Sequence, residues 1–248
     1  MNEVTVQLPI GIFNGDFRYR NVTIKPMTGG TQKKLASKQV RSDPVKLINA
    51  LLLDCVVSIE GQNRITNTVV NSLYIGDRDF LAMEIRKISR GNELITDIVC
   101  PHCKEKLRMT SDLSTDIGSV ALEDVDYTLV DGVPQFTLTD PESDFNATFT
   151  FPDGNAQASV VKYIMKNPVE GVYALMLRCL VDWNGKDPKD VTLAVFDEIS
   201  VTLSDYLMDN FQKNCPGPEF EIPAECSNCG NDIRLTMASS DFLFRLRD

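Results

Sequence analysis

Two pairs of cysteines in this chain have a spacing at which thiol groups do chemistry. Cys100 and Cys103 enclose a Pro-His dipeptide, and Cys226 and Cys229 enclose Ser-Asn. A C-x-x-C pair acts either as a redox dithiol or as half of the ligand set of a metal ion. The two chemistries imply different functions, because the first makes an enzyme and the second makes a structural site.

The residues around the first pair favour a metal site. A redox C-x-x-C lies at the N-terminus of a helix, where the helix dipole lowers the thiol pKa. Residues 104–109 (KEKLRM) instead alternate with the period of a strand, and residues 93–99 (ELITDIV) are also strand-like. This pattern predicts a strand, a tight turn and a second strand. A thiol oxidoreductase that uses Cys100 and Cys103 is the alternative.

The second pair repeats the pattern and completes a ligand set. Gly230 follows the pair directly, which suits a tight turn, and strand-like residues flank it. Two knuckles together supply the four thiolates of a closed, structural Zn²⁺ site. We expect His102, the only histidine, to be exposed, because four thiolates already complete the tetrahedron. The predicted ligands are Cys100, Cys103, Cys226 and Cys229.

An internal repeat explains how the two pairs can meet. In common zinc ribbons about 15 to 20 residues separate the pairs, whereas 122 residues lie between Cys103 and Cys226. Residues 50–61 (ALLLDCVVSIEG) and 174–185 (ALMLRCLVDWNG), however, are identical at six of twelve positions. The cysteine pairs align as well, at an offset of 126 residues. A tandem duplication with a pseudo-twofold axis would bring equivalent knuckles together around one zinc.

Both copies predict the same series of elements. Alternating β-branched residues open each copy and predict a β-hairpin. An apolar helix follows, over 44–58 in the first copy and over 156–183 in the second, where Pro168 marks a break. An amphipathic helix and the knuckle strands complete the copy. The sequence therefore predicts an internally duplicated α+β protein of two pseudo-equivalent units, residues 1–124 and 125–248.

The charge of the chain is uneven. Net charge is −10 at pH 7, and Lys and Arg number 16 against 15 Asp and Glu in residues 1–124, but 9 against 20 in residues 125–248. An acidic surface repels phosphate, so direct nucleic-acid binding is not expected. A zinc-stabilised nucleic-acid-binding protein would need a basic face on the first half. The candidates for that face are Lys33, Lys34, Lys38 and Arg41.

The other cysteines and the N-terminal sequence indicate a reducing compartment. We find no secretory signal and no apolar run long enough to cross a membrane, so we expect a cytoplasmic protein without a membrane partner. Seven cysteines, an odd number, argue against a disulfide scaffold. We expect Cys55 and Cys179, the matched pair inside the apolar helices, to be small core residues, and Cys215 to be inert or exposed.

No catalytic constellation accompanies the cysteines. The sequence lacks the usual phosphate-binding loops, nucleophile motifs and zinc-protease motifs. We interpret Gly29-Gly30 as part of a strand-to-helix turn with Thr31 as N-cap. Asp77 and Asp79 lie in the first turn of a predicted helix, where they complement its dipole. We therefore expect neither catalysis nor a small-molecule substrate.

One stretch resembles a known family. Residues 72–107 (SLYIGDRDFLAMEIRKISRGNELITDIVCPHCKEKL) combine G-D-R-D-F-L, an amphipathic helix, a Gly and a C-P-x-C knuckle. They resemble the baseplate hub and hub-assembly proteins of contractile-tailed, T-even-like bacteriophages. The resemblance implies a non-enzymatic hub component or hub-assembly factor, with hub and tail proteins as partners. It implies a location in the tail baseplate of the virion or, during assembly, in the host cytoplasm.

Overall fold

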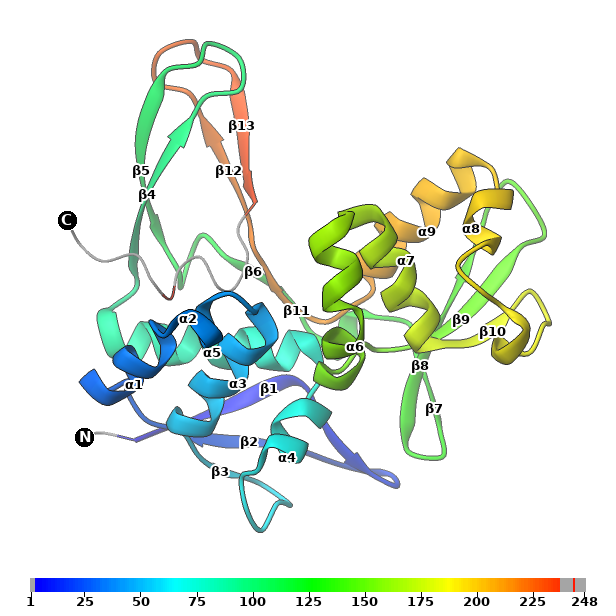
Figure 1. The fold of residues 1–248 in the computed structure, drawn as a ribbon, viewed down its shortest axis with the longest axis horizontal. Helices are drawn as coiled ribbons and strands as arrows, with labels where there is room; N and C mark the ends of the chain where they lie inside the picture. The colour runs from blue at the N-terminus through cyan, green and yellow to red at the C-terminus, as the bar shows by residue number, and fades with distance from the viewer. Residues whose placement is uncertain (1–2, 237–242, 244–248) are drawn as a thin grey trace.

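The computed structural model describes residues 3–236 and Leu243. Small antiparallel sheets and helices form two bodies, and a pair of long β-hairpins projects from them (Figure 1). The molecule therefore mixes helices and strands throughout, which confirms the predicted α+β class.

The elements follow one another as short helices and strands. In the first half they are β1 (Val4–Asn14), β2 (Phe17–Ile24), α1 (Gly29–Leu35), α2 (Lys38–Arg41), α3 (Pro44–Cys55), β3 (Val56–Ile59), α4 (Asn67–Ser72), α5 (Ile75–Arg90), β4 (Glu93–Val99), β5 (Lys106–Asp112), β6 (Gly118–Val120) and the 3-10 helix η1 (Leu122–Asp124). In the second half they are β7 (Thr128–Val130), β8 (Val133–Thr139), β9 (Asn146–Thr150), α6 (Gly154–Lys166), α7 (Pro168–Cys179), β10 (Leu180–Trp183), the 3-10 helix η2 (Pro188–Asp190), α8 (Val195–Glu198), α9 (Val201–Lys213), β11 (Gly217–Glu219), β12 (Glu221–Glu225) and β13 (Asp232–Thr236).

The two halves build their main sheets in the same order. In the first, β2 lies between β1 and β3, and in the second, β9 lies between β8 and β10, with β7 added outside β8. All neighbours in both sheets are antiparallel. In each half the third strand follows directly from an apolar helix, α3 or α7. This shared order is compatible with the predicted duplication.

The apolar helices begin as predicted and end early. α3 starts after Asp43, whose side chain accepts a hydrogen bond from the Val45 N–H at 3.0 Å. α7 starts after Asn167 in the same way, so the predicted break before Pro168 is confirmed. The expected helices over 44–58 and 156–183 were too long at their C-terminal ends. The next four residues instead pair with the middle strand of each sheet, as β3 and β10.

The turn before α1 also differs from the prediction. Thr28, not Thr31, is the N-cap, and its side chain accepts a hydrogen bond from the Thr31 N–H at 3.1 Å. Thr31 is the third helical residue, and its side-chain oxygen in turn accepts a hydrogen bond from the Thr28 N–H. The two glycines are therefore inside the helix, because the capping box starts one residue before them.

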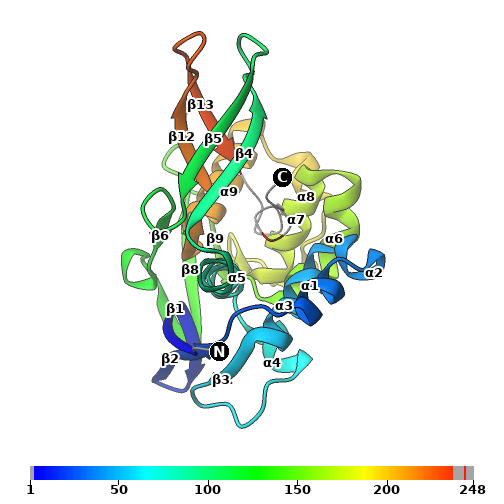
Figure 2. The same ribbon diagram turned by 90° about the vertical axis from the view of Figure 1, so that its left-hand side faces the viewer.

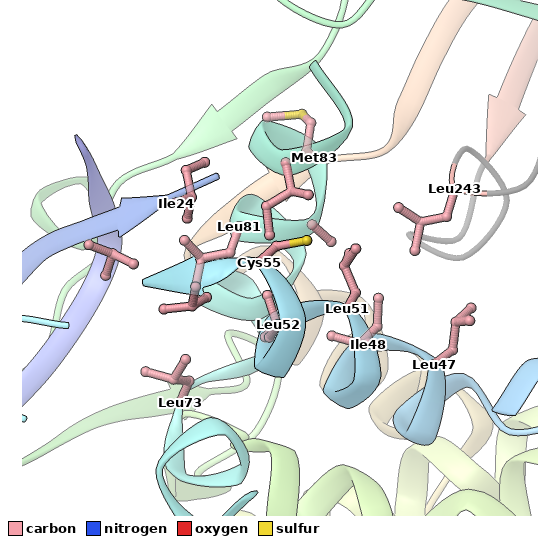
Figure 3. Packing of buried hydrophobic residues seen from close by; sticks show 14 of the residues in the cluster. Ile24, Leu47, Ile48, Leu51, Leu52, Cys55, Leu73, Leu81, Met83 and Leu243 are labelled. Carbon is pink, nitrogen blue, oxygen red and sulfur yellow. The ribbon is translucent and has the colours of Figure 1, made fainter. Parts of the chain in front are cut away.

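Each body has an apolar core of its own. In the first, Leu51 and Leu52 of α3 pack with Leu81 of α5 and Ile24 of β2 (Figure 3). Leu243, from near the end of the chain, also belongs to this core. The second core is aromatic, and its buried side chains include Phe136, Phe149, Phe211 and Trp183.

The chain crosses between the two cores more than once. Ile10 of β1 is buried in the second core and Phe13 packs against it, whereas Leu8 of the same strand is buried in the first core. Ile222 of β12 is buried in the first core. β6 also pairs with β11, so segments about a hundred residues apart in the sequence lie side by side between the two cores.

Two of the cysteines outside the C-x-x-C pairs are core packing residues, as predicted. Cys55 and Cys179 are almost completely buried. Burial raises the pKa of Cys55 to about 11 and that of Cys179 to about 12. Burial raises the pKa of Cys215 as well. Thiols with such pKa values carry little thiolate at neutral pH and are poor nucleophiles.

Candidate metal centre

Two β-hairpins carry the C-x-x-C pairs and extend together from the body of the molecule. β4 and β5 form the first hairpin and β12 and β13 form the second (Figure 1). A view from the side shows both hairpins pointing the same way, with their turns at the far end (Figure 2). The turns are the two knuckles, so residues of widely separated parts of the chain meet there.

The side chains of the hairpin strands alternate between buried and exposed positions. Along β4, Leu94 and Thr96 are buried while their neighbours Glu93 and Ile95 are exposed. Near the turns, Ile98, Leu107 and Ile233 pack with the cysteines in a small apolar cluster. The period-two pattern of the sequence therefore predicted these strands correctly and gives each hairpin one apolar face.

Both knuckles have the same backbone geometry. In the first, the Cys100 N–H donates to the carbonyl of Glu105 at 2.8 Å, and the Lys104 N–H donates to the carbonyl of Cys100 at 3.0 Å. In the second, Cys226 and Asn231 are joined at 2.9 Å, and Gly230 and Cys226 at 2.8 Å.

The residue after the second cysteine takes a left-handed conformation in each turn. Its φ is 64° at Lys104 and 67° at Gly230. Glycine adopts this conformation without cost, and the first knuckle holds a lysine in it. The two turns are thus the same structure built twice, 126 residues apart.

The four sulfur atoms converge. Cys100 Sγ lies 3.8 Å from Cys229 Sγ, and Cys103 Sγ lies 3.7 Å from Cys226 Sγ. All four lie within 4.8 Å of one another, and none is in a disulfide. A tetrahedral ion with metal–sulfur bonds of about 2.3 Å holds its sulfurs about 3.8 Å apart. The sulfur cluster therefore has the size of a four-thiolate metal site.

Side-chain amides of the second knuckle face the sulfurs. Asn228 Nδ2 donates to Cys103 Sγ at 3.5 Å, and Asn231 Nδ2 donates to Cys229 Sγ at 3.3 Å. The hydrogen bond from Asn228, with one from the backbone at Glu105, lowers the pKa of Cys103 to about 6. Hydrogen bonds from Asn231, backbone and side chain, hold the pKa of Cys229 below its usual range. These donors favour the thiolate form of Cys103 and Cys229, which is the form that binds metals.

Comparison with protein families gives a match along almost the whole chain. The family described as T4 bacteriophage base plate protein matches residues 1–243. The chain belongs to this family. The assignment places this base plate protein in the phage virion and implies contacts with other baseplate or tail proteins. No curated protein and no solved structure gave a significant match.

None of the helices described in this base plate protein has the length and apolar character needed to cross a bilayer.

The surroundings of Cys100 do not have the form that a redox C-x-x-C requires. β4 ends at Val99, and β5 begins at Lys106, so the pair lies in a hairpin turn and not at the start of a helix. The low pKa of Cys103 comes from Asn228 in the other knuckle, not from a helix dipole. His102 is exposed, as predicted.

The basic residues considered for nucleic-acid binding lie elsewhere. They belong to or border α1 and α2, on the surface of the first body and away from the knuckles (Figure 1). Lys34 forms an ion pair with Asp54 at 2.7 Å.

Sequence reasoning missed the role of Asp77. Its position in the first turn of α5 is as predicted, but its side chain is completely buried and turns away from its own helix. It accepts hydrogen bonds from the Ile10 N–H at 2.7 Å and the Gly11 N–H at 2.9 Å. These amides lie in a bulge of β1 where the register with β2 shifts. Asp77 thus holds the stretch of β1 that inserts Ile10 into the second core.

Gly76 and Arg78, the neighbours of Asp77 in the G-D-R-D-F-L motif, also make close tertiary contacts. A Cβ at Gly76 would lie 1.7 Å from the carbonyl oxygen of Pro216, so only glycine lets this backbone cross α5. Arg78 is buried and donates to the Val70 carbonyl at 2.7 Å and to Asn49 Oδ1 at 2.8 Å. Gly76 and Asp77 of the motif therefore lie where segments of the two bodies cross, and Arg78 fixes α5 to α3 and α4 within the first body.

Proposed function

We propose that this protein is a non-enzymatic component of the phage baseplate hub, or a factor in hub assembly, with a structural Zn²⁺ bound by Cys100, Cys103, Cys226 and Cys229. The observation that carries the proposal is the convergence of four sulfurs from two distant hairpins in a baseplate-family chain. The hub assignment is supported by the G-D-R-D-F-L and C-P-x-C motifs. Its partners are hub and tail proteins of the same phage, met in the host cytoplasm during assembly or in the virion.

The donor set favours zinc and a structural role. Four thiolates at tetrahedral spacing suit Zn²⁺ or an iron–sulfur centre. With all four positions occupied by protein, a mononuclear site has no place for water or substrate. The metal would supply folding free energy by joining two hairpins that have only a small apolar contact. We propose that the hairpins are equivalent parts of duplicated units, residues 1–124 and 125–248.

Native mass spectrometry of the purified protein, before and after acid denaturation, tests the metal site. We expect one zinc per chain, lost on denaturation, and seven reduced cysteines. Metal-free protein from zinc-supplemented expression, lighter by two hydrogens between Cys100 and Cys103, would support the thiol oxidoreductase instead. An iron signal with visible absorbance would reassign the ion.

A binding assay tests the hub assignment separately. Purified hub and tail-tube proteins of the same phage are mixed one at a time with the zinc-loaded protein, and complexes are measured by sedimentation velocity. We expect at least one hub protein to form a complex. Binding confined to baseplate proteins outside the hub would leave the family intact and overturn the hub assignment.

A further inference from the structure

One strand of the second sheet has an open edge. β7 pairs with β8 on one side, and no other strand among residues 3–236 pairs with its other side. The β7–β8 hairpin protrudes from its sheet, and its turn lies against the tip of the β1–β2 hairpin (Figure 1). Open edges of this kind accept a further strand from another chain.

The register of the hairpin shows which backbone groups face the open edge. The loop is Asp131-Gly132, with φ of 51° and 77°, so Val130 and Val133 close it as a hydrogen-bonded pair. The next pair, Leu129 with Pro134, is then a non-hydrogen-bonded pair, which agrees with the missing N–H of proline. The N–H and C=O of Leu129 therefore point away from β8, toward the open edge.

Exposed apolar side chains surround this edge. Leu129 is 36% exposed, Val130 45% and Val133 39%. The β1–β2 turn joins them, because a Cβ built on Gly132 would lie 3.3 Å from the backbone nitrogen of Gly15. Two residues beyond Gly15, Phe17 is 74% exposed and adds an aromatic side chain to this surface.

The charge at the joined turns is negative and unpaired. Each turn carries one exposed aspartate, Asp16 in the first and Asp131 in the second. Neither forms an ion pair with any residue that the structure describes. Arg18, the nearest cation along the chain, is engaged with Glu123 and with backbone carbonyls of β1. The surface thus favours a basic partner.

We propose that the edge of β7 and the joined turns dock an extended segment of another baseplate or tail protein, with apolar side chains and at least one Lys or Arg, as an added strand. Main-chain hydrogen bonds to Leu129 give the segment its register. Its apolar side chains cover Val130, Val133 and Phe17, and its cations meet the two aspartates. This inference rests on the proposed function, since it takes the partner from the same assembly.

Two variants remove the proposed contacts with little effect on the fold. Leu129→Pro deletes the outward N–H, and proline is tolerated on an edge strand where its N–H would face solvent. The double variant Asp16→Asn with Asp131→Asn removes the charge, and asparagine keeps the turn preference. The matched controls are Val201→Pro, at the exposed first position of α9 where proline is also tolerated, and Asp205→Asn with Asp209→Asn on the same helix.

The probes are the purified baseplate and tail proteins of the same phage, measured one at a time by biolayer interferometry. We expect Leu129→Pro to weaken the complex at least tenfold and the double aspartate variant to weaken it mainly at low salt, while the controls bind as the unmodified chain does. Hydrogen exchange of the Leu129 amide should slow in the complex.

The outcomes separate the two proposals. If a complex forms but all variants bind equally and the Leu129 amide exchanges at the same rate, the docking surface is wrong and the proposed function stands. If no baseplate or tail protein binds the unmodified chain, the proposed function fails and the docking surface with it. A dimer of the chain alone that Leu129→Pro dissociates would show that a second copy occupies the edge, which also overturns the proposal.

Discussion

At the residue scale, the proposed metal site needs sulfurs from two turns that lie far apart in the chain. Cys100 and Cys226 are buried within the apolar cluster at the hairpin tips, whereas Cys229 is exposed and Cys103 is half-buried. Each turn orients its own pair by backbone hydrogen bonds, but neither turn can form a four-sulfur site alone. The contribution of a single thiol is therefore testable by removing it.

Cys103→Ser should abolish stoichiometric metal binding and lower the melting temperature, because three thiolates and a hydroxyl make a poor zinc site. The adjacent variant His102→Ala is the control, since His102 is exposed and the thiolates fill the coordination sphere. Metal content by mass spectrometry and thermal melting measure both effects. Loss of zinc in His102→Ala, or its retention in Cys103→Ser, would contradict the ligand assignment.

Asp77 gives a prediction about pH. Burial raises the pKa of Asp77 to about 7, against the opposing effect of the hydrogen bonds from Ile10 and Gly11. In the unfolded chain an aspartate titrates near 3.9, so between about pH 4 and pH 7 the folded state holds a proton that the unfolded state has lost. Stability contributed by this group should therefore fall as the pH rises, by up to about 1.4 kcal/mol per pH unit, and level off above pH 7.

Urea unfolding of the unmodified protein and of Asp77→Asn, from pH 4 to pH 8, measures this dependence. The variant cannot titrate at residue 77, so the difference between the two unfolding free energies should change across this range. Other groups, including the knuckle thiols, cancel in the difference. Parallel curves would show that Asp77 keeps an ordinary pKa in the fold.

At the scale of elements, the N-terminus of α5 is the point where the two bodies meet. The backbone at Pro216 and Gly217 passes directly over Gly76, and β11 then pairs with β6. An amphipathic helix was predicted here, and α5 ends at Arg90, directly before Gly91. Its crossing with a segment 140 residues later has no local signal, so the reason for glycine at 76 emerges only from the fold.

Gly76→Ala should destabilise the protein by about 1–3 kcal/mol or more, because the new methyl group collides with backbone that has little room to move. Gly29→Ala is the matched control, as a helical glycine with nothing within 4 Å of its would-be Cβ. That change should leave stability unchanged or raise it by less than about 1 kcal/mol. Equal melting temperatures for the two variants would contradict the close crossing.

At the scale of the molecule, two cores are joined by a small number of crossing segments. β1 enters the second core through Ile10, and β12 returns to the first through Ile222. The projecting hairpins have much less apolar contact than either core, and an isolated two-stranded hairpin is marginally stable in water. The proposed metal would therefore stabilise the hairpins more than the bodies.

Removal of the metal with a chelator should increase amide hydrogen exchange over residues 93–112 and 221–236, where the two hairpins lie. The amides of α3 and α9, inside the two cores, should keep their protection. Addition of zinc should restore the protection of the hairpin amides. Uniform loosening of the whole chain, or no change at the hairpins, would contradict a local clamp.

The sequence by itself determined the local features of this protein. The thiol spacing, the alternation around it and the capping residues Asp43 and Asn167 act within a few residues of one another, so the knuckles, their strands and the starts of α3 and α7 were predictable. The C-terminal ends of those helices were not, because residues from Val56 and from Leu180 onward exchange helical hydrogen bonds for pairing with a distant strand.

Only the tertiary structure decided which residues meet. It brought the four sulfurs to tetrahedral spacing, buried Asp77 against a bulge 66 residues before it, and placed the β7 turn against the β1–β2 turn. The repeat predicted that the knuckles would meet but not at what distance. Contacts of this kind depend on the path of the whole chain, and periodicity within a window of residues carries no information about them.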